Sequence, residues 1–284
     1  RDGEASGEEL VRNADLAMYE AKSTRSGHTV YEPSMHDDLV ERMTIAADLR
    51  RALDDDELVL RYQPTVMLGD GHVEGVEALV RWRHPTRGEL APGVFIPVAE
   101  RTGMIREVGR WVLRTACAQA AAWLGAMPDR PIVMNVNVTA VELLDADFVA
   151  SVVAALRDSG LPPGQLVLEL TESSLVEKTE ECSEKLQELR ALGVRIAIDD
   201  FGTGYSSLSY VHRLPVDILK IDRSFIEKVA TLERDGEIVQ TIVALGKTLD
   251  LVTVAEGIET TEQLHVLEEL GCDLGQGYLF ARPL

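Results

Sequence analysis

Glu169-Leu170-Thr171-Glu172 and Asp199-Asp200-Phe201-Gly202-Thr203-Gly204 are two acidic stretches that each follow a short apolar run. The runs are residues 165–168 and residues 194–198, and their composition is typical of strands buried in a parallel sheet. A buried strand that ends in carboxylates needs an explanation, because a desolvated charge requires a partner.

Two further apolar runs lead into acids in the same way. Residues 73–76 precede Glu77, and residues 251–255 precede Glu256. Acids at the carboxyl ends of several different strands are the active-site pattern of an α/β barrel. The sequence therefore predicts an acidic site at one end of a barrel, with a divalent cation as its partner.

Apolar runs and amphipathic stretches alternate from residue 58 onward, which predicts a parallel sheet with right-handed crossovers. The number of units favours a TIM-like (β/α)8 barrel, and 284 residues suffice for one barrel of about 250 residues plus an appendage. A hairpin-length connection joins the first two strands, so one of them should run antiparallel. Strands are expected at residues 58–62, 73–82, 132–136, 165–168, 194–198, 218–221, 251–255 and 273–275. Helices are expected at residues 97–101, 107–126, 147–159, 180–192, 206–210, 237–249 and 261–270.

The first part of the chain has a different pattern. Residues 7–26 and 35–53 are expected to be helical, with a short strand at residues 28–31. This helical segment is too short to bury a core of its own. Because the chain begins with Arg1 rather than Met, we expect it to be part of a longer protein.

Composition excludes several functional classes. The 48 acidic residues exceed the 28 Lys and Arg, and the net charge of −20 argues against binding polymeric nucleic acid. A small anion held by metal ions stays compatible with that charge.

No apolar run reaches the roughly 20 residues of a membrane span, although a longer parent protein could be anchored. Scattered histidines argue against zinc. The unpaired spacing of the cysteines indicates a reducing cytoplasm; they are Cys117, Cys182 and Cys272.

Polar side chains gather at the predicted strand ends. Carboxylates with an Asn carbonyl form an all-oxygen set, which Mg²⁺, Mn²⁺ or Ca²⁺ prefer. So many acids suit two ions roughly 3.5–4 Å apart, an arrangement that supports in-line attack on phosphorus. The residues are Gln63, Glu77, Arg81, Asn137, Glu169, Asp199, Asp200, Lys220, Asp222, Glu256 and Gln276.

Each of these residues also has a structural interpretation. A single Asp after a strand is often a helix N-cap, and Asn137 could cap the helix that follows it. Lys220 could simply pair with Asp222, and Arg81 could be an ordinary residue at the barrel rim. These interpretations lose force because all of them would have to hold together at one end of one barrel.

The ordered motifs resemble the EAL domain, a family of cyclic di-GMP phosphodiesterases. The resemblance covers residues 58–284. Its motifs are Tyr62-Gln63-Pro64, Glu77-Ala78-Leu79-Val80-Arg81-Trp82, Asn135-Val136-Asn137-Val138-Thr139, Glu169-Leu170-Thr171-Glu172-Ser173, Asp199-Asp200-Phe201-Gly202-Thr203-Gly204, Leu219-Lys220-Ile221-Asp222, Ala255-Glu256-Gly257-Ile258-Glu259 and Gln276-Gly277-Tyr278-Leu279-Phe280.

The resemblance implies a metal site and roles for its neighbours. The first metal would be held by Glu77, Asn137, Glu169 and Asp199, and the second by Asp200 and Glu256 with Asp199 as the bridge. Lys220 would orient the attacking water or help to deprotonate it, and Gln276 would order water in the site. Gln63, Arg81 and Asp222 would hold the dinucleotide. Glu172 would anchor the loop of residues 200–207, and Glu259 would support Glu256.

Upstream, Ala14-Asp15-Leu16-Ala17-Met18-Tyr19-Glu20-Ala21-Lys22 looks like the last helix of a GGDEF domain, whose signature motif is absent. The resemblance implies a remnant of such a domain at residues 1–31, a helical linker at residues 32–56 and the EAL barrel at residues 57–284. It also implies a homodimer, with GGDEF and sensory domains in the longer protein.

The implied reaction is hydrolysis of cyclic di-GMP to linear 5′-pGpG with Mg²⁺ or Mn²⁺, inhibited by Ca²⁺. Two alternatives stay open. One is a catalytically silent EAL domain that acts as a cyclic di-GMP receptor, and the other is a signalling scaffold.

Overall fold

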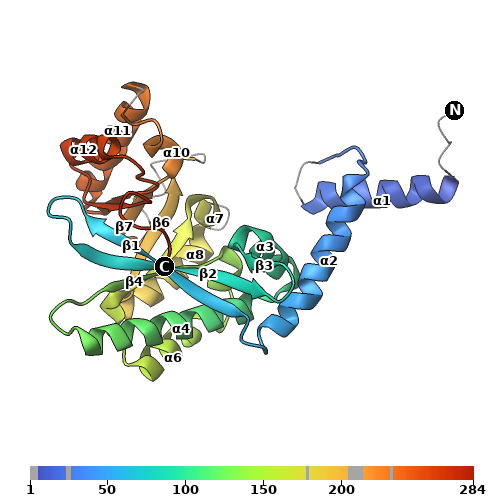
Figure 1. Ribbon diagram of the computed structural model, residues 1–284, viewed down its shortest axis with the longest axis horizontal. Helices are drawn as coiled ribbons and strands as arrows, with labels where there is room; N and C mark the ends of the chain where they lie inside the picture. Colours follow the sequence, from blue (N-terminus) through green and yellow to red (C-terminus); the bar gives the residue numbers. More distant parts are fainter. Residues whose placement is uncertain (1–5, 24–26, 177–178, 204–213, 231–232) are drawn as a thin grey trace.

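The fold, seen in a computed structural model, is a closed barrel of mixed strands surrounded by helices (Figure 1). The structure describes residues 6–23, 27–176, 179–203, 214–230 and 233–284. Within them the strands are β1 (Leu58–Met67), β2 (Val73–His84), β3 (Gly88–Leu90), β4 (Val133–Asn137), β5 (Leu166–Thr171), β6 (Arg195–Phe201), β7 (Ile218–Ile221), β8 (Val252–Ala255) and β9 (Leu274–Gln276). The helices are α1 (Gly7–Ser23), α2 (Ser34–Ala52), α3 (Pro92–Thr102), α4 (Ile105–Ala126), α5 (Ala140–Leu143), α6 (Phe148–Ser159), α7 (Glu172–Val176), α8 (Thr179–Ala191), α10 (Arg223–Ile226), α11 (Glu233–Leu249) and α12 (Thr261–Leu270), with a 3₁₀ turn, η1 (Pro163–Gln165).

The sheet closes through its first strand. The strand order is β1-β9-β8-β7-β6-β5-β4-β2-β3, and an additional pairing of β1 with β2 closes the barrel. Strand β1 runs antiparallel to both of its neighbours, β2 and β9, whereas the pairs from β2–β4 to β8–β9 are parallel. The predicted barrel with one reversed strand is therefore confirmed. Strand β3, which the sequence did not predict, pairs with β2 outside the barrel.

Side chains of the strands alternate between two cores. Outward residues such as Leu168 and Leu219 pack against the surrounding helices. Inward residues form a smaller apolar cluster inside the barrel; they are Val167, Ala197, Ile218, Val254 and Leu274. The next inward positions toward the carboxyl ends of the parallel strands are polar, so the apolar cluster forms a floor beneath them.

The N-terminal helices extend from the side of the barrel (Figure 1). Helix α1 lies at the far end, and α2 packs against α3 and joins α1 to the barrel. The predicted helices at residues 7–26 and 35–53 correspond to α1 and α2, of which residues 24–26 lie outside the described part. The strand expected at residues 28–31 was wrong, since these residues pair with no other strand in the described chain. The domain boundaries at residues 31 and 56 stay predictions.

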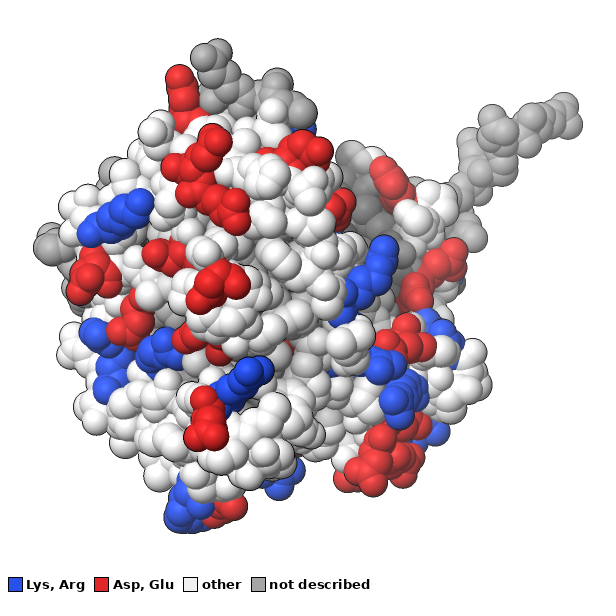
Figure 2. Space-filling view, turned by 60° about the vertical axis from the view of Figure 1, so that its left-hand side comes forward, with Lys and Arg blue, Asp and Glu red and all other residues white. Residues whose placement is uncertain are grey.

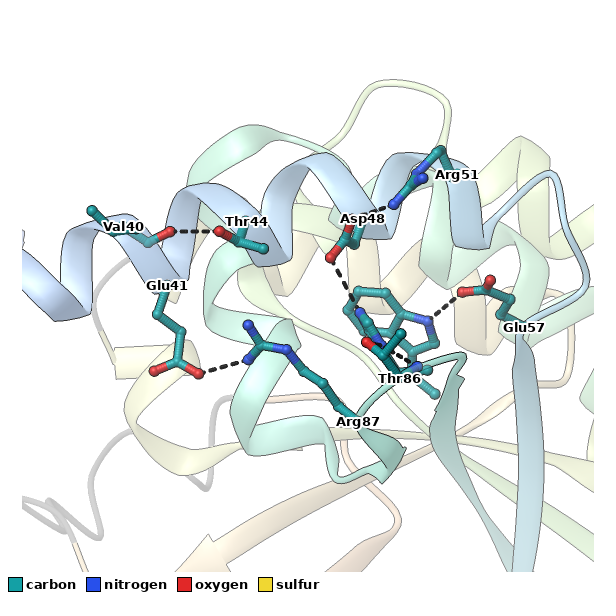
Figure 3. A network of polar contacts seen from close by, with 10 residues as sticks. Val40, Glu41, Thr44, Asp48, Arg51, Glu57, Thr86 and Arg87 are labelled. Atoms are coloured by element: carbon teal, nitrogen blue, oxygen red, sulfur yellow. Dashed lines mark hydrogen bonds and ion pairs between the residues drawn. The ribbon is translucent and has the colours of Figure 1, made fainter.

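Three polar contacts attach α2 and the segment that follows it to β2 and its turn (Figure 3). Arg87 Nη1 donates to Glu41 Oε1 at 2.7 Å, and Trp82 Nε1 donates to Glu57 Oε2 at 2.9 Å. His84 Nε2 lies 3.2 Å from Asp48 Oδ2. His84 is the last residue of β2 and is buried. The helix therefore has a defined position against the barrel rather than a free one.

The end of the chain is also fixed to the barrel. Leu284 N donates to Tyr62 O at 3.0 Å, and Tyr62 N donates to Leu284 O at 3.1 Å, so the last residue pairs with β1. In the part of the chain that the structure describes, we find no helix with both the length and the apolar character that a membrane crossing demands.

Candidate active site

Four strands each place a carboxylate around one lysine at the carboxyl end of the barrel. Lys220 Nζ lies 2.6 Å from Glu256 Oε1, 2.7 Å from Glu169 Oε2, 3.2 Å from Asp199 Oδ1 and 4.0 Å from Glu77 Oε2. Lys220 and Glu169 are each 2% exposed, so the centre of the cluster is dry. The predicted residues Glu77, Glu169, Asp199 and Lys220 therefore lie together, because each occupies an inward position on its strand. Glu256 joins them directly after β8.

A bulge in β6 adds a fifth carboxylate. Regular alternation would turn Asp200 away from Asp199, but the pairing of β6 with β7 shifts between Ile198 and Phe201. Asp200 has φ +54°, in the left-handed region that Asp tolerates better than most residues. As a result, carboxylate oxygens of Asp199, Asp200 and Glu256 all lie within 4.8 Å of one another.

Amide side chains hold Glu77 from two sides. Asn137 Nδ2 donates to Glu77 Oε1 at 2.6 Å, and Gln276 Nε2 donates to Glu77 Oε2 at 2.7 Å. Gln276 Nε2 also lies 3.2 Å from Gln63 Oε1, and Gln63 Nε2 donates to Ala281 O at 3.1 Å. Because the Asn137 amide nitrogen is engaged, its carbonyl oxygen is the atom left for a cation.

The charges in the cluster are out of balance. Burial raises the pKa of Glu169 well above its usual value, and burial followed by the nearby Asp199 raises the pKa of Glu256 to about 8. Burial and then Asp199 also raise the pKa of Asp200 to about 6. Burial alone would lower the pKa of Lys220, but the surrounding carboxylates, Asp199 first, hold it well above its usual value. One ammonium group therefore does not neutralise the acids, and this all-oxygen donor set fits hard divalent cations.

A pocket of about 200 Å³ opens above the cluster. Its walls include predicted site residues such as Gln63 and Glu77, together with three side chains to which the sequence analysis gave no role: Leu79, Arg223 and Tyr278. Leu79 and Tyr278 stand inside motifs quoted for the resemblance, whereas the only sequence signal for Arg223 was its position next to Asp222.

Arg81, Asp222 and Glu172 lie outside the carboxylate cluster, and so does Glu259, whose Oε1 lies 3.1 Å from Arg223 Nη2. Arg81 Nη1 donates to the neighbouring Val80 O at 2.9 Å, and the pocket lining does not include Arg81. Asp222 caps α10, because its Oδ1 accepts from Ser224 N at 3.0 Å, and its charge is among the causes that raise the pKa of Asp200, after burial and Asp199.

Glu172, the third of these residues, lies at the start of α7 and contacts the chain beyond β6. Gly202 N donates to Glu172 Oε2 at 2.8 Å, two residues after Asp200. Gly202 has φ +100°, and a Cβ there would lie 2.8 Å from the Phe225 ring, so this turn requires glycine. Residues 204–207 of the predicted loop, and the helix expected at residues 206–210, lie outside the described residues.

The structural interpretations of single residues are confirmed for Asp222 and wrong for Asn137 and Lys220. The N-cap interpretation holds for Asp222, whereas the cap of α5 is Thr139 rather than Asn137. The ion pairs of Lys220 in the described residues go to Glu77, Glu169, Asp199 and Glu256 and not to Asp222.

The fold and this arrangement of acids agree with a comparison to known families, in which the EAL domain matches residues 46–283. The chain belongs to the EAL domain family. The predicted family is thereby confirmed, and the match begins within α2. Phosphodiesterases of this family depend on metal, and the acidic cluster of this EAL domain can bind a metal ion.

Two relatives from Pseudomonas aeruginosa are named as cyclic di-GMP phosphodiesterases. This EAL domain is 48% identical over 97% of its length to the bifunctional diguanylate cyclase/cyclic di-GMP phosphodiesterase MucR, of which it covers 40%. It is 46% identical over its whole length to the cyclic di-GMP phosphodiesterase NbdA, of which it covers 36%. The chain thus spans well under half the length of these curated relatives.

A solved structure supports the same assignment. The PaMucR phosphodiesterase in complex with c-di-GMP is 47% identical, and it superposes with a TM-score of 0.81 over 85% of this chain and 97% of that one. On the face of this EAL domain seen in Figure 2, acidic and basic side chains are interspersed and form no continuous basic patch.

Proposed function

We propose that this EAL domain hydrolyses cyclic di-GMP to linear 5′-pGpG with the help of Mg²⁺ or Mn²⁺, and so lowers the level of this second messenger. The observation that carries the proposal is the convergence of Glu77, Glu169, Asp199 and Glu256 around Lys220 beneath a pocket. The names of MucR and NbdA support the substrate and the reaction.

The metal ligands fall into two sets. The first ion would be held by Glu77, Glu169 and Asp199 with the carbonyl oxygen of Asn137. The second ion would be held by Asp200 and Glu256, with Asp199 available to both. The close approach of oxygens from Asp199, Asp200 and Glu256 supports the second set. When bound, the ions supply positive charge that stabilises the reacting phosphate.

The protein's own groups position the reactants. Water attacks phosphorus, the bond to the 3′ oxygen breaks, and that oxygen leaves with a proton as a hydroxyl group, which yields 5′-pGpG. Lys220, which lies among Glu169, Asp199 and Glu256, orients the attacking water or helps to deprotonate it. Gln276 orders water beside Glu77. The substrate is held by Gln63, Arg81 and Asp222.

Incubation of the chain with cyclic di-GMP and Mn²⁺, followed by chromatography, tests the proposal, and we expect pGpG to accumulate. Glu77→Ala should stop the reaction, because it removes a ligand and leaves Asn137 and Gln276 without their shared acceptor. Circular dichroism should show an intact fold, since Glu77 lies at the functional end of β2. A Glu77→Ala variant that turns over at the parent rate would contradict the ligand assignment.

A receptor without catalytic activity is the alternative from another class. Parent protein that binds cyclic di-GMP in calorimetry but produces no pGpG with either metal would establish it. The intact set of acids favours turnover, because a receptor needs contacts to the dinucleotide and not four carboxylates around one lysine.

The proposed function also includes an assembly. In the cell, this EAL domain works as a homodimer, joined to GGDEF and sensory domains in the longer protein.

Regulation acts through the end of β6. Glu172 accepts a hydrogen bond from Gly202 N, two residues after Asp200, and so fixes the turn that carries Asp200. Loss of this hydrogen bond would let Asp200 move and would change the second metal site. Dimer packing near Glu172 provides a route by which an upstream domain sets activity. The opposing view is a static loop with incidental dimerisation, and a demonstrated two-state element is needed to decide between them.

Glu172→Ala should lower turnover and weaken the affinity for the second metal, because Asp200 loses the anchor of its turn. The measurement is turnover as a function of Mn²⁺ concentration, with Glu184→Ala on the exposed side of α8 as the control. Unchanged turnover together with unchanged metal dependence in the Glu172 variant would remove this contact from the mechanism.

A further inference from the structure

Glu256 stands at the start of a turn between β8 and α12 that contacts the barrel on one side. Glu256 N donates to Ile221 O at 3.1 Å, which continues the pairing with β7. Ile258 N donates to Gln276 O, and Leu279 N donates to Ile258 O, both at 3.0 Å, so the turn also rests on the end of β9. The opposite side of the turn faces α10.

Arg223, the first residue of α10, covers that opposite side. Gly257 has φ +73°, and a Cβ there would clash with Arg223 Cγ and lie 2.9 Å from both Arg223 Cβ and Cδ. The aliphatic part of Arg223 therefore lies directly on the backbone next to Glu256. The head of the side chain reaches further, since Nη2 lies 3.1 Å from Glu259 Oε1 and Nε donates to Glu227 Oε1 at 2.8 Å.

Gln263 makes a second connection between the same two elements. Its Oε1 accepts from Glu259 N at 2.7 Å and from Thr260 N at 3.0 Å, as part of the capping box of α12. Its Nε2 donates to Ile226 O at 3.2 Å, and Gln263 is 7% exposed. A buried amide with these bonds is costly to displace, so α10 and the turn move together.

We propose that Arg223 and Gln263 are positioning residues that hold the turn carrying Glu256 in place for the second metal ion, and this proposal rests on the proposed function. Together with Glu259 they form a clamp, defined as these three residues, between the turn and α10. Because α10 begins directly after Asp222, the clamp also fixes the distance between Glu256 and a substrate-holding residue.

The packing of Arg223 should matter more than its charge. Its side chain is 50% exposed and that of Glu259 is 43% exposed, and exposed ion pairs contribute little. The aliphatic part of Arg223 instead occupies the space beside Gly257, so the turn cannot move toward α10. Loss of partners that orient a metal ligand typically lowers metal affinity by about 10–100-fold. We therefore expect a graded series in which Arg223→Ala weakens the second metal more than Arg223→Met, and Arg223→Lys least.

Calorimetric titration of the purified chain with Mn²⁺, without substrate, is the decisive measurement. Arg223→Ala should lower the affinity of the weaker Mn²⁺ site about tenfold at an unchanged melting temperature of the metal-free protein. Turnover should fall at limiting Mn²⁺ and return toward the parent value at excess Mn²⁺. Arg157→Met on α6, an exposed arginine paired with Asp158, is the matched control and should behave as the parent.

The outcomes separate the clamp from the proposed function. Parent-like Mn²⁺ affinity in Arg223→Ala, or a raised KM with unchanged metal affinity, would overturn the clamp while pGpG production by the parent still stands. Weakened Mn²⁺ binding in a chain whose parent makes no pGpG would support the clamp and contradict the proposed reaction. If Arg223→Ala does not fold, Gln263→Met and Glu259→Gln repeat the titration, and parent-like affinity in both would overturn the proposal.

Discussion

Replacement of Asp199 by Asn should lower turnover by a factor on the order of 10³ or more, the largest effect that we expect from a single substitution. Asp199 lies 3.2 Å from Lys220 and within the oxygen cluster of Asp200 and Glu256, and we therefore propose that it serves both metal sites. Asn keeps the shape of the side chain and removes its charge, and the loss therefore reports electrostatics rather than packing.

The comparison with a ligand of one ion makes this prediction specific. Asp200→Asn should cost less turnover than Asp199→Asn, because Asp200 belongs to the second set alone. Asp54→Asn, at an exposed position after α2, is the control for substitution as such. Initial rates at saturating cyclic di-GMP and Mn²⁺ provide the measurement. An Asp199→Asn variant within tenfold of the parent would show that Asp199 is not shared between the ions.

Local signals in the sequence were sufficient for most helices and strands. The predicted helix at residues 261–270 coincides with α12, because Thr260 and Gln263 form its capping box and Gly271 ends it with φ +72°. Strand β7 was likewise predicted at its observed bounds. Strands β5 and β6 continue beyond their predicted ends, since Thr171 pairs with Asp199. The predicted strands ended where the apolar run ended. The backbone hydrogen bonds of a strand continue past that point, because a polar inward side chain does not interrupt them.

Contacts between distant segments could not be predicted from local patterns. Strand β3 forms only because residues 88–90 return beside β2, and the strand expected at residues 28–31 has no such partner in the described chain. The inward position of Asp200 depends on a bulge, which the spacing of Asp199-Asp200 alone does not reveal. The site residues were found because they end separate strands, whereas the clamp at Arg223 depends on packing between α10 and a turn more than thirty residues away in sequence.

Removal of divalent cations should abolish turnover, and this is the second large effect that we expect. Burial and mutual repulsion already raise the pKa of Glu256 to about 8 in the metal-free protein, so the cluster lacks positive charge. With EDTA present, Lys220 is the single cation within 4.0 Å of the four strand-end acids among the described residues, and it cannot replace two divalent ions.

The choice of metal provides the stricter form of this test. Mg²⁺ or Mn²⁺ added in excess of EDTA should restore pGpG production and raise the melting temperature, because a ligand that binds only the folded state stabilises it. Ca²⁺ should inhibit, since it takes 6–8 oxygen ligands at about 2.3–2.6 Å whereas Mg²⁺ requires octahedral geometry at about 2.0–2.1 Å. We expect Ca²⁺ to raise the melting temperature without restoring turnover, which separates occupancy of the site from activity. Full turnover in EDTA would contradict metal dependence, and Ca²⁺ that supports turnover as well as Mn²⁺ would contradict the two-ion geometry.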